Sequence, residues 1–256
     1  MVKEQWRLID SEFEDSCMNL AIDEAIPTVL GMGYTNNTIW FWRNVNTVVV
    51  GRSQDVLSEV NLEACNKYGT FVIRRFTGGG TVYHDLGNLN YSISLRKNHS
   101  LISDDLTRTV EVLSQGVMLG LKNLGIKAEY RSSEGIFISD KKISGSASAV
   151  KQSFFFNHGT LLINSNLTIL SEVLSPTLKR RKKSGVKSSH RIVTNLAFEL
   201  GREISISDVK EALKWGFESA FQIELVKDKL TSKETLMAQK FLEKNFSERI
   251  FLPSDV

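Results

Sequence analysis

The sequence predicts an α/β protein. Strands and long helices share the N-terminal two thirds, and the part from about residue 192 to residue 256 is mostly helical. Two observations lead to this prediction. Short β-branched and aromatic runs recur up to residue 164, and longer segments with a helical apolar period lie between and after them. The chain has 256 residues, 41% hydrophobic and 24% charged, which is ordinary globular composition and predicts one large domain.

Runs of β-branched and aromatic residues predict the strands of the first third. These strands span Gln5–Ile9, Thr38–Arg43, Thr47–Gly51, Phe71–Arg75 and Asn88–Leu95. The second and third are separated only by residues 44–46, so we expect them to pair with each other.

Residues that typically begin or end helices occur in the same region. Ser16 is the expected N-cap of a first helix, which Pro27 should end or kink. A short helix over Val60–Tyr68 should end at Gly69, because glycine readily adopts the left-handed conformation of a helix C-terminus.

The middle of the chain predicts the longest helix followed by four strands. Ser103 should open this helix and Gly125 should follow its last turn. The expected turn between the second and third of the strands is Ser139–Asp140. The four strands span Lys127–Arg131, Gly135–Ile138, Lys142–Val150 and Gly159–Asn164.

The remaining segments are predicted to be helical. Short helices are expected over Leu167–Leu174 and Ile192–Leu200, with the basic stretch Leu178–Arg191 forming a loop before the second. Ser207 is the expected cap of a further helix, and the capping box that begins at Thr231 should open a last helix reaching about residue 246.

Bulk properties exclude several classes of protein. A net charge of +3 gives no reason to expect nucleic-acid binding. The cysteines, Cys17 and Cys65, show neither a disulfide framework nor a metal-ligand spacing, which fits a reducing compartment. No signal peptide and no apolar run of membrane-spanning length is recognisable, so we expect a cytoplasmic protein without a membrane partner.

The segment Arg74–Asp85 is the first candidate for chemistry. It contains the consecutive glycines Gly78, Gly79 and Gly80 between two predicted strands. Glycines allow a ligand to approach the backbone closely, and consecutive N–H groups can bind an anion. The guanidinium of Arg75 adds charge with bidentate hydrogen-bonding geometry. The simpler alternative is a tight turn between strands.

Two further residues are candidates. Lys142 opens a strand of small residues against which a ligand could lie, and its ammonium could bridge a carboxylate and a phosphate. A solvated hairpin lysine is the alternative. His158 precedes a strand that is expected to be buried, where a histidine serves either as a structural donor or as a site residue.

Together these segments resemble the lipoate–protein ligase A family of the biotin/lipoate ligase superfamily. The resemblance rests on motifs in order along the chain from Met18 to Leu196. They are M-N-L-A-I-D-E-A, R-R-F-T-G-G-G-T-V-Y-H-D-L-G-N-L-N-Y-S, K-K-I-S-G-S-A, H-G-T-L-L-I-N-S-N-L and V-K-S-S-H-R-I-V-T-N-L. The glycine motif and K-I-S-G-S-A are specific as a pair.

The resemblance implies a mixed, mostly antiparallel sheet flanked by helices, within a single catalytic domain over residues 1–256. It implies that lipoate and ATP, accompanied by Mg²⁺, give lipoyl-AMP, and that the lipoyl group then passes to a lysine of an acceptor. The acceptors would be lipoyl domains of 2-oxoacid dehydrogenase complexes or the glycine-cleavage carrier protein. No metal ligands can be assigned from the sequence.

Site residues follow from the motif positions. ATP binding is assigned to Arg75, Gly80, Thr81, Val82, Tyr83 and Lys142, with Lys142 as the catalytic residue. Lipoate binding is assigned to Arg75, Thr77, Gly78, Gly79, Lys142 and His158.

The chain departs from the family at three places. Glu134-Gly135 stands where Asn-Asp is usual, and His190 and Ile192 replace arginines on either side of Arg191. The C-terminal accessory domain of the longer ligases is also expected to be absent. Shorter relatives obtain it as a separate polypeptide, so the resemblance implies an accessory subunit.

Two alternatives stay open. A transferase of the same superfamily would move an octanoyl or lipoyl group, but octanoyl transferases use a cysteine near the lysine strand or shortly after it. Here no cysteine follows Cys65. A non-catalytic subunit that binds lipoyl domains would have little reason to keep Arg75, the three glycines and Lys142 together.

Overall fold

The computed structural model describes residues 3–174, 192–245 and 250–251. Its centre is an eight-stranded sheet in the order β11-β1-β2-β6-β10-β9-β8-β7. β1 pairs in parallel with both β11 and β2, and the other neighbours pair antiparallel, so the predicted mixed and mostly antiparallel sheet is confirmed. The strands are β1 Glu4–Asp10, β2 Thr38–Trp42, β6 Asn88–Arg96, β7 Glu129–Arg131, β8 Gly135–Ile138, β9 Lys141–Val150, β10 Phe154–Leu162 and β11 Ile223–Asp228.

A second, four-stranded sheet carries the glycine segment. Its order is β12-β4-β3-β5, from β3 Thr47–Val50, β4 Phe71–Arg74, β5 Val82–His84 and β12 Ile250–Phe251. The predicted pairing of the second and third strands is wrong, because β3 pairs with β4 and β5 whereas β2 lies in the large sheet. Residues 43–46 therefore carry the chain from one sheet to the other instead of forming a hairpin.

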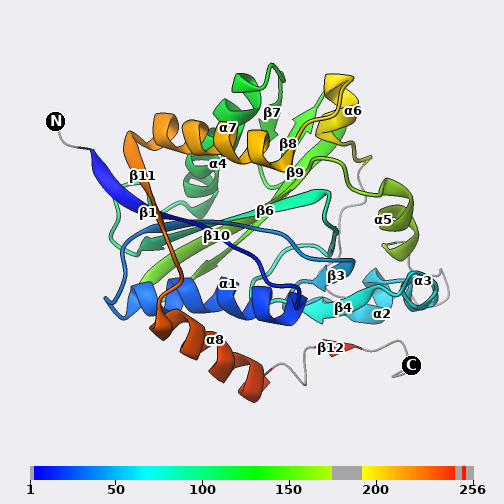
Figure 1. Cartoon of the computed structure of the whole chain (residues 1–256), viewed down its shortest axis with the longest axis horizontal. Helices are drawn as coiled ribbons and strands as arrows, with labels where there is room; N and C mark the ends of the chain where they lie inside the picture. The colour runs from blue at the N-terminus through cyan, green and yellow to red at the C-terminus, as the bar shows by residue number, and fades with distance from the viewer. Residues whose placement is uncertain (1–2, 175–191, 246–249, 252–256) are drawn as a thin grey trace.

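Helices cover both faces of the large sheet (Figure 1). α4 and α7 pack on one face, while α1, α8 and the small sheet lie on the other. Shorter helices join the strands at the edge. The bounds are α1 Ser16–Gly31, α2 Val56–Glu59, α3 Leu62–Tyr68, α4 Leu106–Asn123, α5 Leu167–Val173, α6 Leu196–Leu200, α7 Ile206–Phe221 and α8 Ser232–Asn245.

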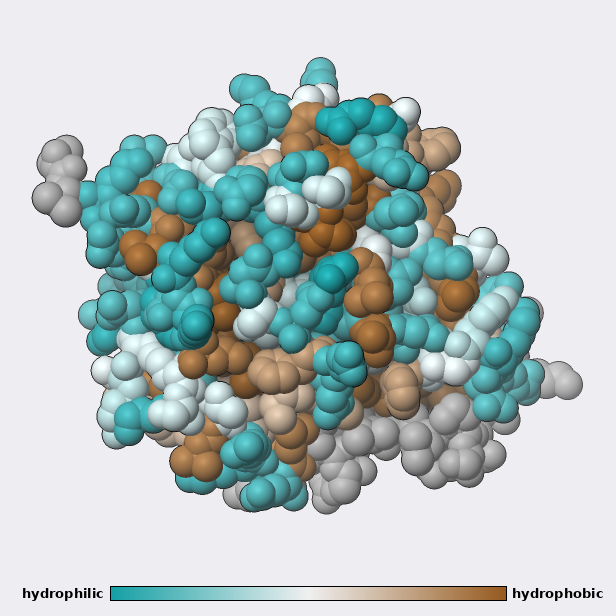
Figure 2. All heavy atoms as spheres, in the orientation of Figure 1, coloured by the Kyte–Doolittle hydropathy of each residue, from teal (hydrophilic) through white to brown (hydrophobic). Residues whose placement is uncertain are grey.

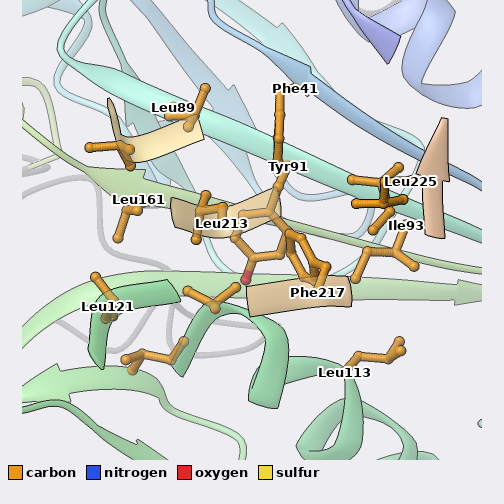
Figure 3. Close-up of a cluster of buried hydrophobic side chains, with 14 of the residues drawn as sticks. Phe41, Leu89, Tyr91, Ile93, Leu113, Leu121, Leu161, Leu213, Phe217 and Leu225 are labelled. Atoms are coloured by element: carbon orange, nitrogen blue, oxygen red, sulfur yellow. The ribbon is translucent and has the colours of Figure 1, made fainter. Parts of the chain in front are cut away.

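The side chains of β6 alternate between an apolar face and a polar face of the large sheet. Leu89, Tyr91 and Ile93 point toward α4 and α7, where they pack in the largest hydrophobic cluster with Phe217 (Figure 3). Successive side chains of a strand point to opposite faces. The polar residues between them, such as Asn90, therefore face α1 and the small sheet, and they are buried there. A polar interior on this side of the sheet indicates a functional site.

Several predicted helix ends are corrected. The N-caps are Asp15, Asp105 and Ser205, whose side chains accept hydrogen bonds from the first turns of α1, α4 and α7. The predicted caps Ser16, Ser103 and Ser207 are wrong, because a neighbouring residue provides the acceptor in each case. The predicted stops at Gly69 and after Leu124 are confirmed, with φ of 61° at Gly69 and 84° at Gly125.

Pro27 does not end α1, which continues to Gly31. Proline in a helix interior removes one backbone hydrogen bond. The flanking residues Ile26, Val29 and Leu30 are completely buried. The burial of this turn offsets the lost hydrogen bond, because the apolar surface of three large side chains leaves water.

The predictions for the last third are correct in part. The capping box is confirmed, since the Glu234 amide donates to Thr231 Oγ1 (3.2 Å) and the Thr231 amide donates to the Glu234 carboxylate (2.7 Å). That carboxylate also accepts from the buried guanidinium of Arg7 (2.7 Å). The mostly helical C-terminal part contains the unpredicted strand β11, which extends the large sheet.

Two further predictions concern the segments before it. β10 begins at Phe154, five residues earlier than expected. The basic stretch lies outside the described residues.

The face seen in Figure 2 mixes hydrophilic and hydrophobic side chains. Two apolar residues are each 73% exposed: Ile192, in the segment that leads to α6, and Phe198, within that helix. None of the helices in the described part of the chain combines the length and apolarity that crossing a bilayer requires.

Replacing Gly216 with alanine is expected to lower the free energy of unfolding by about 1–3 kcal/mol. α4 and α7 pack so closely that a Cβ at Gly216 would lie 2.2 Å from the Gly116 carbonyl oxygen. A backbone carbonyl cannot rotate away from the added methyl group as a flexible side chain can, so the two helices would have to move apart. Denaturant unfolding measures the change. Gln115→Ala, at an exposed position of α4, is the control and should leave stability nearly unchanged.

Candidate active site

Two adjoining cavities, of about 500 and 420 Å³, meet at Lys142. Five residues from three segments line both cavities. They are Thr81 and Val82, which follow the glycines, Lys142 and Gly145 on β9, and Thr160 on β10. The glycine segment and the lysine strand, sixty residues apart in sequence, therefore form one continuous site.

Lys142 lies between two glycines. A Cβ at Gly135 would lie 2.9 Å from Lys142 Cε, and one at Gly145 would lie 3.1 Å from both its Cε and its Nζ. Larger residues would displace the lysine side chain, so the glycines fix its path into the site. The neighbouring Lys141 forms an ion pair with Glu199 (2.7 Å) instead.

Arg75 organises the glycine loop from within. Its guanidinium is 5% exposed and donates to the carbonyls of Val49 (3.0 Å), Gly78 (2.5 Å) and Gly80 (2.7 Å). Burial lowers its pKa to about 10, and attraction by Asp23 opposes that effect. The carbonyls therefore face the arginine, which leaves the loop's amides available to a ligand.

The loop is also tied to the end of β3. A Cβ at Gly51 would lie 2.2 Å from the Gly79 carbonyl oxygen, and Gly79 has φ of 82°, so both positions require glycine. The Thr81 hydroxyl donates to Gln54 Oε1 (2.9 Å). The amide of Gly51 donates to the same oxygen (3.1 Å), which fixes the loop relative to the turn after β3.

A buried hydrogen-bonded chain supports the wall of the first cavity. His158 Nδ1 lies 2.6 Å from the Asp23 carboxylate, and its Nε2 lies 2.8 Å from Thr77 Oγ1. The Thr77 hydroxyl also accepts from Arg75 Nε (2.9 Å). With Nδ1 directed at Asp23 and Nε2 at the Thr77 hydroxyl, both ring nitrogens of His158 have a partner in this chain.

The second cavity is mostly apolar on the α5 side. Leu162, Leu167, Leu170 and Leu174 line it, together with Tyr83 on the β5 side. The Tyr83 hydroxyl donates to Asn46 Oδ1 (3.1 Å), and burial raises its pKa to about 12. A flat apolar group would fit between the leucines on the α5 side and the β5 side of this cavity.

Most predicted site residues come together at the two cavities. The first is lined by Arg75, Gly78, Gly79, Gly80, Thr81, Val82, Lys142 and His158, and the second by Thr81, Val82, Tyr83 and Lys142. Thr77 lies behind the wall and contacts His158 and Arg75. Of the substituted family positions, Glu134 and Gly135 line the first cavity and Ile192 lines the second. His190 lies outside the described residues.

Sequence reasoning missed several residues of the site. Trp42 and His84 line the first cavity, Glu59 lines the second, and Asp23 holds His158. Asp23 belongs to the motif M-N-L-A-I-D-E-A, in which no local pattern indicates that this residue contacts His158. The T-shaped contact of Trp42 with His84 (5.9 Å between centroids) could not be read from local patterns.

Neither cysteine lines either cavity. Cys65 is buried in the core around β3 and α3, and Cys17 lies in the first turn of α1 and packs against a second hydrophobic cluster. Burial raises the pKa of both thiols to about 12, so neither is a thiolate at neutral pH. In the described residues no three histidine, cysteine, aspartate or glutamate side chains form a metal-binding group.

Comparison with known proteins gives relatives of similar length. The chain is 31% identical over 240 residues to lipoate-protein ligase A subunit 1 of Thermoplasma acidophilum, covering 90% of this chain and 89% of the relative. It is 28% identical over 268 residues to octanoyltransferase LipM of Brevibacillus brevis, covering 95% and 97%. Sequence similarity therefore extends to both a ligase and a transferase.

Solved structures agree with this fold. A bi-partite lipoate protein ligase from Thermoplasma acidophilum, studied with its E2 lipoyl domain, superposes with a TM-score of 0.82 at 31% identity and covers 95% of this chain and 94% of its own. A Thermoplasma acidophilum protein with bound lipoic acid gives 0.81 at 29% identity, covering 95% and 96%. A lipoate-protein ligase A bound with ATP gives 0.80 at 29% identity, covering 96% of each chain.

The profile of the lipoyl protein ligase A/B catalytic domain matches residues 15–218, which include all the residues assigned to the site. With this match and the shared fold, the chain belongs to the lipoyl protein ligase A/B catalytic domain family.

Proposed function

We propose that this protein is a lipoate–protein ligase, which activates lipoate with ATP and transfers the lipoyl group to a lysine of a lipoyl domain. The observation that carries the proposal is the position of Lys142 at the junction of two cavities. An adenylate-forming enzyme has to bring a carboxylate and an α-phosphate together at one cation, and this junction supplies one.

The first cavity is the proposed lipoate site. It extends between the two sheets past Leu20, Trp42 and Val49, which suit an apolar chain. The second cavity is the proposed adenosine site, with the backbone of residues 80–83 on one side and the leucines near α5 on the other. Relatives solved with bound lipoic acid and with bound ATP support a site for each of these ligands in the fold.

The first step joins two anions. A carboxylate oxygen of lipoate attacks the α-phosphorus of ATP, the bond to the bridging oxygen breaks, and pyrophosphate leaves with those electrons. Lys142 would neutralise charge on both reactants, and the amides of Gly79 and Gly80 would contact the phosphates. The lysine of the acceptor then attacks the carbonyl carbon of lipoyl-AMP, and AMP leaves with the oxygen that came from lipoate.

Glu134 and Glu59 are the carboxylates that line the two cavities. Magnesium usually binds one or two carboxylates together with substrate phosphates. These residues fit a magnesium ion carried by the nucleotide, whose contribution would be to neutralise the phosphates.

The partners we propose are lipoyl domains and a separate accessory polypeptide. The Thermoplasma acidophilum relative is named as subunit 1 of a ligase, and the solved structure of a bi-partite ligase was studied with its E2 lipoyl domain. We further propose that the chain works as a single catalytic domain in the cytoplasm, where lipoyl domains and ATP are both present.

The second candidate is an octanoyl transferase, which the similarity to LipM over nearly the whole chain favours. A covalent acyl-enzyme needs a nucleophile in the site, and neither cysteine lines it. We expect the Cys17→Ala/Cys65→Ala double variant to keep acyl transfer to a lipoyl domain within a few-fold of the unmodified chain. Mass spectrometry of the acceptor measures this. Loss of transfer in a correctly folded double variant would support the transferase.

Mass spectrometry of an apo lipoyl domain also tests the main proposal. The protein is incubated with lipoate and ATP, with and without a candidate accessory subunit, and separately with octanoyl-carrier protein. Modification that requires ATP and free lipoate supports the ligase. Modification from octanoyl-carrier protein without ATP would replace it with the transferase, and full activity of this chain alone would contradict the need for an accessory subunit.

A further inference from the structure

His84 provides a buried hydrogen-bond donor that no atom of the described residues accepts. It lies on β5, is 3% exposed and lines the first cavity. Its Nε2 is buried and has no hydrogen-bond partner among the described residues. Buried polar atoms are nearly always paired, so an unpaired one on a cavity wall indicates that a ligand supplies the partner.

The surrounding contacts determine that Nε2 carries the proton. The backbone of Phe13 fixes the amide of Asn19, because its N–H donates to Asn19 Oδ1 (2.8 Å) and its carbonyl accepts from Asn19 Nδ2 (2.7 Å). Asn19 Nδ2 lies 3.0 Å from both the Arg43 carbonyl oxygen and Asn44 Oδ1, so the oxygen of the Asn44 amide is the atom that faces Asn19. Asn44 Nδ2 must then donate to His84 Nδ1 (3.3 Å), which leaves the hydrogen of a neutral imidazole on Nε2.

The imidazole is neutral at physiological pH. Burial, followed by the positive charge of Arg75, lowers the pKa of His84 to about 3. The nearby Trp42 cannot provide the same donor, because its Nε1 already donates to Ser92 Oγ (3.0 Å). His84 Nε2–H is therefore an uncharged donor on the cavity wall, and among the described residues Asn90 Nδ2 is a second buried nitrogen without a partner that belongs to a residue of the same cavity.

The position of His84 suits the far end of the acyl chain. Val82 lines both cavities, whereas His84 lines only the first and lies two residues further along β5 on the same strand face. Two residues of a strand advance by roughly 7 Å. A carboxylate held at the junction beside Lys142 would thus direct the other end of its chain toward His84.

We propose that His84 Nε2–H donates to a dithiolane sulfur of lipoate and so makes the site prefer lipoate to octanoate. A sulfur of this kind is a weak acceptor, whereas octanoate has only C–H groups at the same carbons. Octanoate would therefore bury the donor without a partner, which costs binding free energy. This inference rests on the proposed function, because it places the carboxylate at Lys142.

Binding measurements test the inference without requiring turnover. Dissociation constants for lipoate and octanoate are measured by calorimetry for the wild-type chain, His84→Leu and His84→Gln. We expect His84→Leu to reduce the preference for lipoate by about tenfold, because the unpaired donor is gone. His84→Gln keeps an N–H donor at a similar reach and should keep the preference close to that of the wild type. An unchanged preference in His84→Leu would overturn the inference.

The wild-type protein gives a second readout that does not depend on a folded variant. In ¹⁵N NMR spectra, His84 should be the Nε2–H tautomer, and its Nε2 resonance should shift with lipoate and much less with octanoate. Equal shifts would contradict the proposed contact. If lipoate is preferred through His84 but no adenylate forms, the ligase proposal fails and the specificity inference stands. Failure to bind either acid would overturn both.

Discussion

Replacing Lys142 with alanine is expected to lower the rate of lipoyl-AMP formation by about 10²–10³-fold. Its ammonium lies at the junction of the two cavities, where the carboxylate of lipoate and the α-phosphate of ATP would meet. Without it, the developing charge has no fixed cation. Adenylate formation is measured as pyrophosphate release that depends on lipoate, at saturating ATP.

The neighbouring lysine is the matched control. Lys141 forms its ion pair with Glu199, and its Nζ lies 5.1 Å from the centre of the Phe198 ring. It lines neither cavity. Lys141→Ala removes the same charge from the same strand and should leave adenylate formation close to normal. Near-normal activity in Lys142→Ala, or an equal loss in both variants, would show that the catalytic lysine is misassigned.

Replacing Asp23 with asparagine is expected to lower the free energy of unfolding by about 3 kcal/mol or more. Asp23 is 1% exposed, accepts from Ser92 Oγ (2.5 Å) and holds His158 Nδ1. Its charge also offsets the cost of burying the Arg75 guanidinium. The neutral amide removes the negative charge that attracts this buried cation, so both the core and the glycine loop should be weakened.

Denaturant unfolding and lipoate binding measure the two effects of Asp23→Asn. The control is Asp104→Asn, which removes one negative charge from an exposed position and should change stability by less than about 0.5 kcal/mol. We expect lipoate affinity to fall together with stability in Asp23→Asn only. A variant as stable as the control would contradict the role of Asp23 as the counter-charge of Arg75.

The parts of the site that the sequence predicts are those with local signals. Three consecutive glycines between two strands, and a lysine before a run of small residues, are visible without knowledge of the fold. The structure explains both: Gly79 needs a positive φ, and Gly145 makes room for the Lys142 side chain. A positive φ or a close approach by another group requires glycine at one particular position, so the requirement is visible in the sequence itself.

The parts that the sequence does not predict depend on contacts between distant segments. Asp23 and His158 are 135 residues apart, and no pattern around either residue indicates the pairing. β3 also has the composition expected of a hairpin partner of β2, but it pairs with β4 and β5, and its Val48 packs with Val72 and Tyr83 in one core cluster. β5 itself has only three residues, which is too short for periodicity to reveal.

Activation of lipoate as an adenylate at Lys142 can be followed with an isotope label in the lipoate carboxylate. Lipoate labelled with oxygen-18 in its carboxylate is incubated with ATP, an apo lipoyl domain, the protein and its accessory subunit. We expect one labelled oxygen in the AMP that is released, because the bond between lipoate oxygen and phosphorus survives when lysine attacks the carbonyl carbon. A lipoylated domain formed together with unlabelled AMP, or formed without AMP, would contradict the account.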